Sequence, residues 1–345
     1  MIAQTESERL LKYHAFDEDV LASVEEVANV QRKMDFNALN STLPDNKPFY
    51  PISEGKPIEV IDTGPSDDNE RTLVYHSWMG AGLDANLRAR MATLSAALPT
   101  TRIIIAGSPG APGSRSGRLA MNQVPSVWGG DLRATVDPLL QYVQSQGLSV
   151  ITHGGYSYGA DKAPVAAALS SEYDQMANQV ISVEPSSVKL RKFLWLESLG
   201  IVRLGLDFNS ADAALEGYVL ASNSQALIEA RELAATASHG KVGLLVGLLK
   251  PSNIAASKAL SKDGFAGRMT KALIKNPEMR ADTIWGSLSE LSISGLTTVI
   301  VEHLVDQFGP ERVSGTIIDD QKHTMCDDIF LHTAIISQAL KKNTK

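Results

Sequence analysis

A serine with a glycine two residues before it and another two residues after it, in Gly155-Tyr156-Ser157-Tyr158-Gly159, constrains the fold of this chain more than any other feature. Before it, residues 148–152 (LSVIT) form a short apolar run that predicts a buried strand; after it, residues 162–169 (KAPVAAAL) predict a helix rich in small residues. A strand that turns directly into a helix needs glycine on both sides of the tip, because a Cβ there would collide with the neighbouring turn. The pattern therefore predicts a strained turn with the Ser157 hydroxyl at its tip.

Further apolar, β-branched runs occur along the chain and predict the other strands of a sheet. We expect strands at residues 58–61, 71–76 (RTLVYH), 102–106 (RIIIA), 179–183, 297–301 (TTVIV) and 314–318 (SGTII). Helical segments separate several of these runs, and this alternation is typical of an α/β fold with a doubly wound, mostly parallel sheet.

A serine at the tip of such a turn is a candidate nucleophile, although an ordinary Gly/Ser turn would have the same pattern. Catalysis would need a base to take the serine proton and an acid to orient that base. His323 follows the expected strand at 314–318, and Asp306 follows the one at 297–301, so we assign Ser157, Asp306 and His323 as a triad in chain order. Glu302 lies closer to the strand end and is a rival for the acid.

At these residues the chain resembles the α/β-hydrolase family. Besides the turn at Ser157, the matching segments are residues 76–80 (HSWMG), 108–114 (SPGAPGS), 303–306 (HLVD) and 320–323 (DQKH). They resemble the family's oxyanion, proline-glycine, acid and base loops, with departures at Ser77, His303 and Asp320. The resemblance implies an oxyanion hole made by the backbone N–H groups of Trp78 and Tyr158. Because some serine hydrolases take the acid from an earlier strand, it also makes Glu184 a third candidate.

The expected organisation has four parts. Residues 1–50 form an N-terminal helical arm, which braces the core or mediates a homo-oligomer contact, and residues 51–188 form the first part of the hydrolase core. Residues 189–294 contain no obvious strand and are rich in helix formers, notably at 210–239, 253–262 and 271–288. By resemblance we interpret this stretch as an inserted helical cap, and residues 295–345 as the last part of the core.

Composition excludes several classes of protein. The chain has 32 basic and 39 acidic residues and a net charge of -7, without the basic stripe expected of a nucleic-acid-binding protein. The single cysteine, Cys326, cannot form an internal disulfide, and the dispersed histidines have no metal-ligand spacing. Because no run of about 18 apolar residues occurs, we expect no membrane span. The polar start of the chain shows no secretory signal, so the default compartment is cytoplasmic.

These features together predict a serine hydrolase that acts on a small-molecule ester of a hydrophobic or medium-chain acid, without a cofactor or metal. Acyltransferase, thioesterase and carbon-carbon bond hydrolase activities on the same triad are alternatives. A noncatalytic, hydrolase-like binding module is an alternative from another class.

Overall fold

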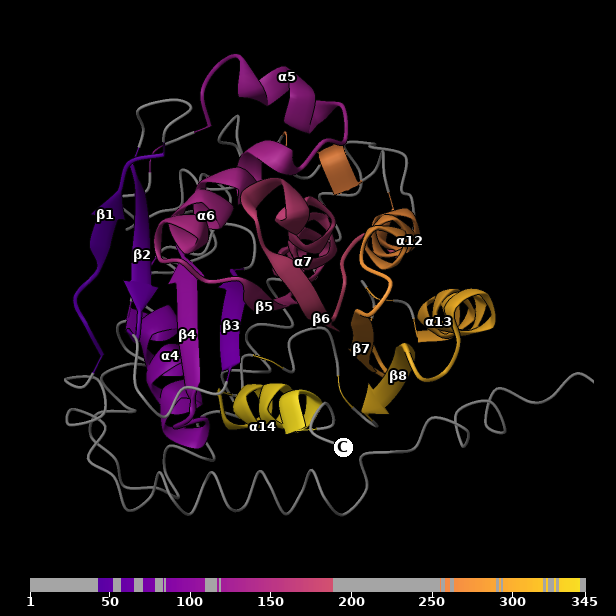
Figure 1. Ribbon diagram of the computed structural model, residues 1–345. Coiled ribbons are helices and arrows are strands. Elements are labelled where there is room, and N and C mark those ends of the chain that lie inside the picture. The colour runs from indigo at the N-terminus through magenta and orange to yellow at the C-terminus, as the bar shows by residue number, and fades with distance from the viewer. Residues whose placement is uncertain are drawn as a thin grey trace, which may run out of the picture.

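A computed structural model of the 345-residue chain gives the architecture (Figure 1). The structure describes residues 43–51, 57–64, 71–77, 83, 85–108, 117, 119–188, 255, 258–260, 264–289, 292, 294–318, 321, 326 and 329–341. Nearly all of the expected N-terminal arm, residues 1–42, lies outside the described residues, as do residues 189–254 of the expected cap.

Strands and helices alternate along the described part of the chain. The strands are β1 (Lys47–Phe49), β2 (Ile58–Asp62), β3 (Arg71–His76), β4 (Thr101–Ala106), β5 (Val150–Tyr156), β6 (Met176–Val183), β7 (Arg280–Gly286) and β8 (Val313–Ile318). The helices are α4 (Ala85–Ala97), α5 (Gln123–Trp128), α6 (Arg133–Ser145), α7 (Tyr158–Leu169), α12 (Phe265–Lys275), α13 (Ser294–Phe308) and α14 (Ile329–Lys341), with a 3₁₀ turn η1 at Ser170–Tyr173.

The strands form one eight-stranded sheet in the order β1-β2-β4-β3-β5-β6-β7-β8. The strands β4, β3, β5, β6, β7 and β8 pair in parallel, and β1 and β2 are antiparallel at one edge. The expectation of a doubly wound, mostly parallel sheet is confirmed. In such a sheet, the loops at the carboxyl ends of the strands lie along one edge, where α/β proteins bind their ligands.

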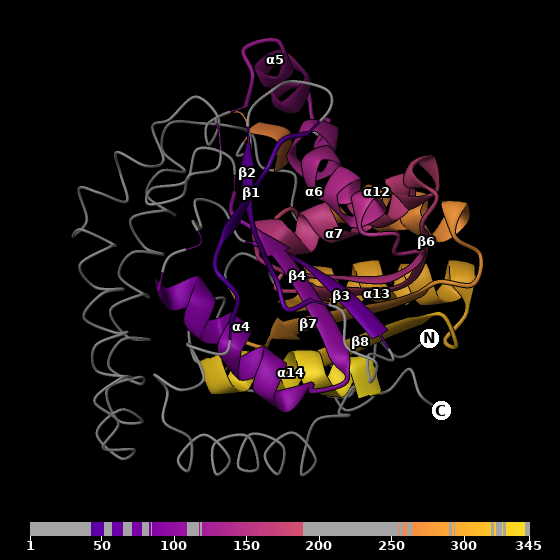
Figure 2. The same cartoon turned by 60° about the vertical axis from the view of Figure 1, so that its left-hand side comes forward.

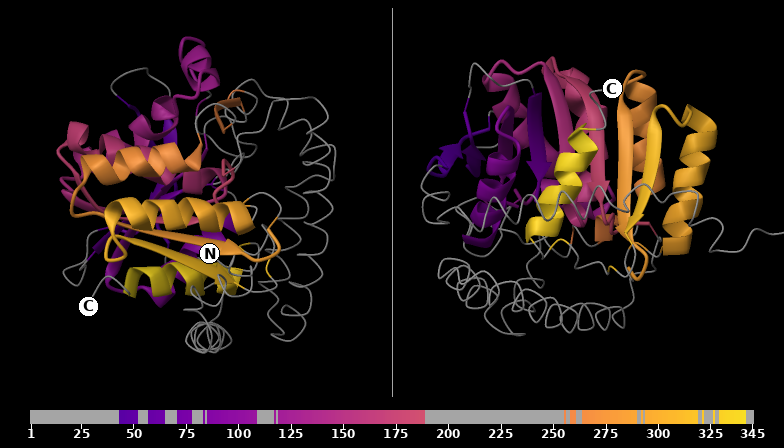
Figure 3. Two further views of the ribbon diagram at one scale, coloured as in Figure 1. Left: turned by 90° about the vertical axis from the view of Figure 1, so that its right-hand side faces the viewer. Right: turned by 90° about the horizontal axis from the view of Figure 1, so that it is seen from below.

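Helices cover both faces of the sheet (Figure 2). The helices α4 and α14 contact one another and share an apolar core with Leu73, Tyr75 and Ile103. On the other face, α7, α12 and α13 pack on β6, β7 and β8, while α6 covers β2, β3 and β4. Figure 3 shows β7 and β8 between the orange helices on one side and the yellow α14 on the other. Because both faces are covered, the parallel strands are largely buried, and those with mainly apolar sequences, such as β3 and β4, were recognisable from the sequence.

Two expectations for the C-terminal half are wrong. Residues 297–301 are not a strand but part of α13, where Thr297, Thr298, Val301 and Leu304 are buried at helical spacing. Instead, β7 occupies Arg280–Gly286, inside the segment expected to be helical and part of the cap, and it pairs between β6 and β8. The last part of the core therefore begins before residue 295. The helical periodicity of 294–308 outweighs the strand preference of its β-branched residues.

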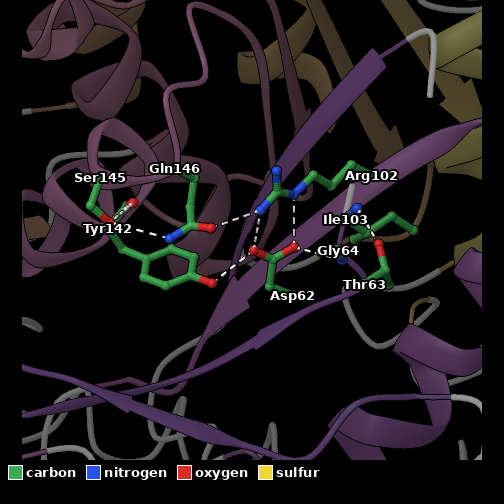
Figure 4. Close-up of polar contacts among 8 residues, drawn as sticks. All are labelled: Asp62, Thr63, Gly64, Arg102, Ile103, Tyr142, Ser145 and Gln146. Atoms are coloured by element: carbon green, nitrogen blue, oxygen red, sulfur yellow. Dashed lines mark hydrogen bonds and ion pairs between the residues drawn. The ribbon is translucent and has the colours of Figure 1, made fainter. Parts of the chain in front are cut away.

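A buried ion pair fixes β2 to β4 near the antiparallel edge of the sheet (Figure 4). The Arg102 guanidinium donates from Nε to Asp62 Oδ1 at 2.9 Å and from Nη2 to Asp62 Oδ2 at 2.6 Å. The Tyr142 hydroxyl, from α6, donates to the same Oδ2 at 2.7 Å, and the Gly64 N–H donates to Oδ1 at 2.9 Å. The two charged side chains are only 7% and 6% exposed, so the pair lies almost out of water.

Candidate functional site

The turn at Ser157 has the strained geometry that the sequence predicts. Ser157 has φ 56° and ψ -122°, a conformation that non-glycine residues rarely adopt, and it lies between the end of β5 and the start of α7. Its N–H donates to Val183 O at 2.9 Å, and its carbonyl accepts from Ala160 N at 2.9 Å. The backbone is therefore held by β6 on one side and by the first turn of α7 on the other.

The flanking glycines are required by close backbone contacts. A Cβ at Gly155 would lie 2.3 Å from the carbonyl carbon of Gly159, and a Cβ at Gly159 would lie 1.9 Å from His76 O. Both distances are far shorter than any real Cβ contact. Glycine at both positions lets the start of α7 approach β5 and the end of β3 closely, which is the geometry of a nucleophile elbow.

The elbow lies at the carboxyl edge of the sheet, near its centre. Gly155 pairs with His76 at the end of β3, and Tyr156 pairs with Val183 at the end of β6. Tyr158 is the first residue of α7, so its backbone N–H is one of the four that a helix leaves without an intrahelical partner. Trp78, the expected second oxyanion donor, and His323, the expected base, lie outside the described residues.

Asp306 and Glu302 are not brought to Ser157. Asp306 is exposed in the last turn of α13, which leads through Gly309 to the amino end of β8. Ser157 follows the carboxyl end of β5, and β5 to β8 are all parallel. Ser157 therefore lies at the carboxyl ends of the strands, whereas Asp306 lies near their amino ends. The assignment of Asp306 assumed a strand at 297–301 with a loop at its carboxyl end. Because this segment is a helix, the assignment is corrected here, and that of Glu302 fails for the same reason.

Glu184, in contrast, directly follows the residue that accepts the hydrogen bond of Ser157. It too has a positive φ, 53°, and it is fully buried. Its Oε1 accepts from Gly286 N at 2.5 Å, and its Oε2 accepts from the hydroxyls of Ser289 at 2.5 Å and Ser292 at 2.7 Å. A carboxylate with this many fixed donors is held in one orientation at the carboxyl edge of the sheet.

The loops after β7 and β8 are joined to one another beside Glu184. Ser287 N donates to Ile318 O at 2.9 Å, and Leu288 N donates to Gln321 O at 2.9 Å. A Cβ at Gly286 would lie only 2.1 Å from Gln321 O, so the two loops pack backbone to backbone. The chain that continues from Gln321 to His323 therefore starts next to the residues that hold Glu184.

A second buried ion pair joins the start of α7 to α12. Arg268 Nη1 donates to Asp161 Oδ1 at 3.2 Å and to Ser187 Oγ at 3.1 Å, while Nη2 donates to Ala259 O at 3.1 Å. Asp161 also accepts from the Ser186 N–H at 2.9 Å. The cluster fixes the chain after β6 and the chain before α12 to the helix that carries the elbow.

Two buried histidines lie between the sheet and α7, and their tautomers follow from their hydrogen bonds. The Ser170 hydroxyl donates to Ala166 O at 3.0 Å, so it accepts from His153 Nε2 at 2.9 Å. The other nitrogen of a neutral His153, Nδ1, then accepts from His76 Nε2 at 3.3 Å. Burial lowers the pKa of His153 to about 3. Burial, and after it electrostatic repulsion from the neighbouring His153 and Lys162 sites, lowers the pKa of His76 well below its usual value. Both rings are therefore neutral at pH 7.

Sequence reasoning gave no role to Lys162 or to the partners of Glu184. Lys162 lies in α7 and is 3% exposed, and the only signal in the sequence is a lysine among small apolar residues. The partners of Glu184 lie more than 100 residues away along the chain, so no local pattern could identify them. Among the described residues no cluster of His, Cys, Asp and Glu could hold a metal ion, and no helix is long and apolar enough to cross a membrane.

Solved structures with the same architecture are numerous, although their sequences differ greatly from this one. A bromoperoxidase from Bacillus anthracis is 17% identical, with a TM-score of 0.53 over 86% of this chain and 100% of its own. A carboxylesterase of the thaumarchaeon Nitrososphaera gargenis is 12% identical, with a TM-score of 0.52 over 86% and 100%. The thioesterase domain of the curacin biosynthetic pathway is 14% identical, with a TM-score of 0.51 over 86% and 100%. No protein-family model and no curated protein matches the sequence.

The sheet order, the elbow and these structural neighbours define the fold class of the chain. It has the α/β-hydrolase fold, as the sequence resemblance predicted. At 12–17% identity, the neighbours show this fold and no particular activity.

Proposed function

We propose that this protein is a serine hydrolase that cleaves a carboxylic ester, with Ser157 as nucleophile, His323 as base and Glu184 as the acid of the triad. The Ser157 hydroxyl attacks the ester carbonyl while His323 takes its proton, and His323 then protonates the leaving alcohol. Water, activated by the same histidine, releases the acyl group from the enzyme. This chemistry needs no cofactor.

The observation that carries the proposal is the backbone of Ser157. Ser157 has φ 56° at the tip of a strand-to-helix turn, and two glycines that no other residue could replace without backbone movement enforce this conformation. A turn without a function would not need such conformational strain. Its place at the carboxyl edge is where a doubly wound sheet binds substrates.

In the proposed mechanism, the backbone N–H groups of Tyr158 and Trp78 hold the oxyanion. Tyr158 supports this role because it begins α7, so its N–H points out of the helix start, where the helix dipole also favours negative charge. Each such donor contributes about 10²–10³ in rate in acyl-transfer enzymes.

Glu184 replaces Asp306 as the proposed acid. It lies one residue after Val183, which accepts the Ser157 N–H, and its carboxylate is held by the loop after β7. That loop contacts Gln321, two residues before His323. A carboxylate so placed would orient the imidazole and stabilise its protonated form during each proton transfer.

The proposed substrate is an ester of a hydrophobic or medium-chain acid. The same groups would also serve a thioesterase, an acyltransferase or a carbon-carbon bond hydrolase, depending on which acceptor reaches the acyl group. Among the structural neighbours, one is a carboxylesterase and another a thioesterase, so both acyl chemistries occur on this fold.

Labelling with a fluorophosphonate probe tests the proposal. We expect the wild type to be labelled, and Ser157→Ala and His323→Ala to lose the label while remaining folded by circular dichroism. Ser145→Ala, which removes an exposed serine of α6, is the control and should label like the wild type. A folded wild type that does not react would favour the noncatalytic binding module instead.

The acid is tested separately with Glu184→Gln and Asp306→Asn. Loss of the triad acid lowers kcat by about 10⁴ in other serine hydrolases, so Glu184→Gln should lower nitrophenyl ester turnover by about 10³–10⁴. Asp306→Asn should leave it within about twofold of the wild type, since surface substitutions are close to neutral. Equal rates for the two variants would refute the role of Glu184.

A further inference from the structure

A small pocket lies at the carboxyl ends of β3 and β4, against α6 and α7. It is partly open to solvent and has room for a water-sized group. Its described lining consists of Ile58, His76, Ser77, Ala106, Gly107, Thr135, Pro138, Leu139 and Lys162. Ser157 is not among these residues, so the pocket is separate from the elbow. Lys162 belongs to α7, the helix that begins directly after Ser157.

Lys162 is the only charged residue of this described lining. Its side chain is 3% exposed, and its ammonium makes no hydrogen bond or ion pair with any residue that the structure describes. It lies 5.1 Å from the centre of the Tyr158 ring, a cation–π contact that only partly replaces the lost hydration. Buried lysines are rarely left without a counter-charge, because removing an ammonium from water is unfavourable by several kcal/mol.

The other polar groups of the pocket cannot neutralise Lys162. The Ser77 hydroxyl donates to Ala106 O at 3.0 Å, and the Thr135 hydroxyl donates to Leu132 O at 2.7 Å. His76 is neutral and donates to His153. The described lining contains no aspartate or glutamate, so the ammonium of Lys162 faces this small space without a described counter-charge.

We propose that this pocket is a binding site for a small monoanion, a halide or a carboxylate group, with Lys162 as its counter-charge. The anion would supply the negative charge that the described lining lacks. Because Ser77 lines the pocket and directly precedes the expected oxyanion segment, an occupied site would also support the start of that segment.

The site is pH-dependent because only a protonated Lys162 attracts an anion. Burial lowers the pKa of Lys162 to about 7, so the lysine loses its charge just above neutral pH. Among the described residues, the titratable groups around it are His76 on β3, His153 on β5 and Tyr158 on α7. The two histidines stay neutral above pH 6, and burial raises the pKa of Tyr158 to about 12, so Lys162 alone changes charge between pH 6 and pH 9. Asp161, also on α7, is paired with Arg268 of α12.

Thermal unfolding in sodium formate, compared with sodium gluconate at equal ionic strength, measures the binding directly. Gluconate provides the same charge but is too large for the pocket. We expect formate to raise the Tm of the wild type at pH 6.5, since a ligand that binds only the folded state stabilises it. Above pH 7 the apparent Kd for formate should rise about tenfold per pH unit, as the ammonium is lost.

Lys162→Met should abolish the formate response, while Lys275→Met, which removes an exposed lysine of α12, should retain it. Ser157→Ala should also retain it, so the outcome does not depend on the proposed hydrolase activity. The wild-type pH series keeps the proposal testable even if Lys162→Met does not fold.

The anion could be free in solution or part of a substrate, and ester turnover distinguishes the two sources. If a substrate carboxylate fills the site, Lys162→Met should raise KM for a nitrophenyl hemisuccinate but not for nitrophenyl acetate, and formate should compete with the former. If the anion is free, KM for both esters should change equally and formate should not compete. The proposal is overturned if formate and gluconate give the same Tm for the wild type at pH 6.5, or if Lys162→Met responds to formate like the wild type.

Discussion

The buried pair of Asp62 and Arg102 gives the most quantitative test of the structure. Asp62→Asn keeps the shape of the side chain but removes its charge. Apart from residue 62, the described side chain that accepts a hydrogen bond from Arg102 is Gln146, whose Oε1 lies at 3.1 Å and carries no charge. Both side chains of the pair are less than a tenth exposed, so water cannot replace the lost carboxylate.

Breaking one half of a buried ion pair is destabilising by about 3–5 kcal/mol, because the other charge stays buried without compensation. A domain of ordinary stability has only about 5–15 kcal/mol in total. Asp62→Asn should therefore remove a large share of the free energy of unfolding. Tyr142→Phe, which removes one hydrogen bond to the same carboxylate, should remove about 1.5–3 kcal/mol.

Urea unfolding at pH 7, followed by circular dichroism, measures these differences from the shift in midpoint at constant slope. The matched control is Glu172→Gln, since Glu172 pairs with Arg133 at 2.7 Å but the two side chains are 39% and 41% exposed. An exposed pair of this kind contributes about 0–1 kcal/mol. If Asp62→Asn and Glu172→Gln destabilise equally, burial does not determine the strength of the pair, and the reasoning fails.

The pH dependence of this pair has a definite sign. Burial by itself raises the pKa of Asp62, but the hydrogen bonds from Arg102, Tyr142 and the Gly64 N–H outweigh it, so the pKa lies below its usual value of 3.8. A carboxyl whose pKa is lower in the folded state stabilises the protein above the unfolded pKa, and this contribution is lost as the pH falls through the folded pKa. The difference between wild type and Asp62→Asn should therefore be constant from pH 5 to 7 and shrink below about pH 4.

Three further predictions concern the elbow and its surroundings. Gly159→Ala places a Cβ 1.9 Å from His76 O and should lower the free energy of unfolding by about 3 kcal/mol or more. In Gly154→Ala the new Cβ meets only side-chain atoms, the nearest at 3.0 Å, so the loss should be smaller. Differential scanning calorimetry compares the two variants. Because the unfolded chain keeps the Lys162 proton up to about pH 10.5 while the folded protein releases it near pH 7, wild-type stability should rise by about 4 kcal/mol from pH 7 to 10 relative to Lys162→Met in urea titrations. Ser289→Ala removes a donor to Glu184 and should lower kcat for nitrophenyl esters about 10–100-fold with KM unchanged; an unchanged kcat would count against Glu184.

The sequence was sufficient to predict the features that depend on a local pattern of residues. The elbow needs only two glycines and a serine at fixed spacing, and its steric requirement could be derived without coordinates. The strands at 71–76 and 102–106 were recognisable because their buried residues are mainly apolar, and the one at 314–318 because it ends in two isoleucines.

The sequence was insufficient where tertiary contacts decide. The strand β7 contains Asp282, which looks unsuited to a buried strand, but Gln179 Nε2 and Ser314 Oγ from the two neighbouring strands donate to it. The segment 297–301 has strand-like residues, yet its burial repeats with helical spacing. The error in this one segment also misplaced the acid, since Asp306 was chosen on an expected strand before it and on the resemblance of residues 303–306 to an acid loop.

Arg268 has a consequence for how this protein could change over evolution or by design. Through its two terminal nitrogens it binds both Ser187, where the chain leaves the core after β6, and Ala259, where the chain returns before α12. The two ends of the intervening stretch are thus fixed within the span of one guanidinium group, whatever lies between them. The stretch can therefore be exchanged for a shorter or unrelated one while the sheet and the elbow keep their shape.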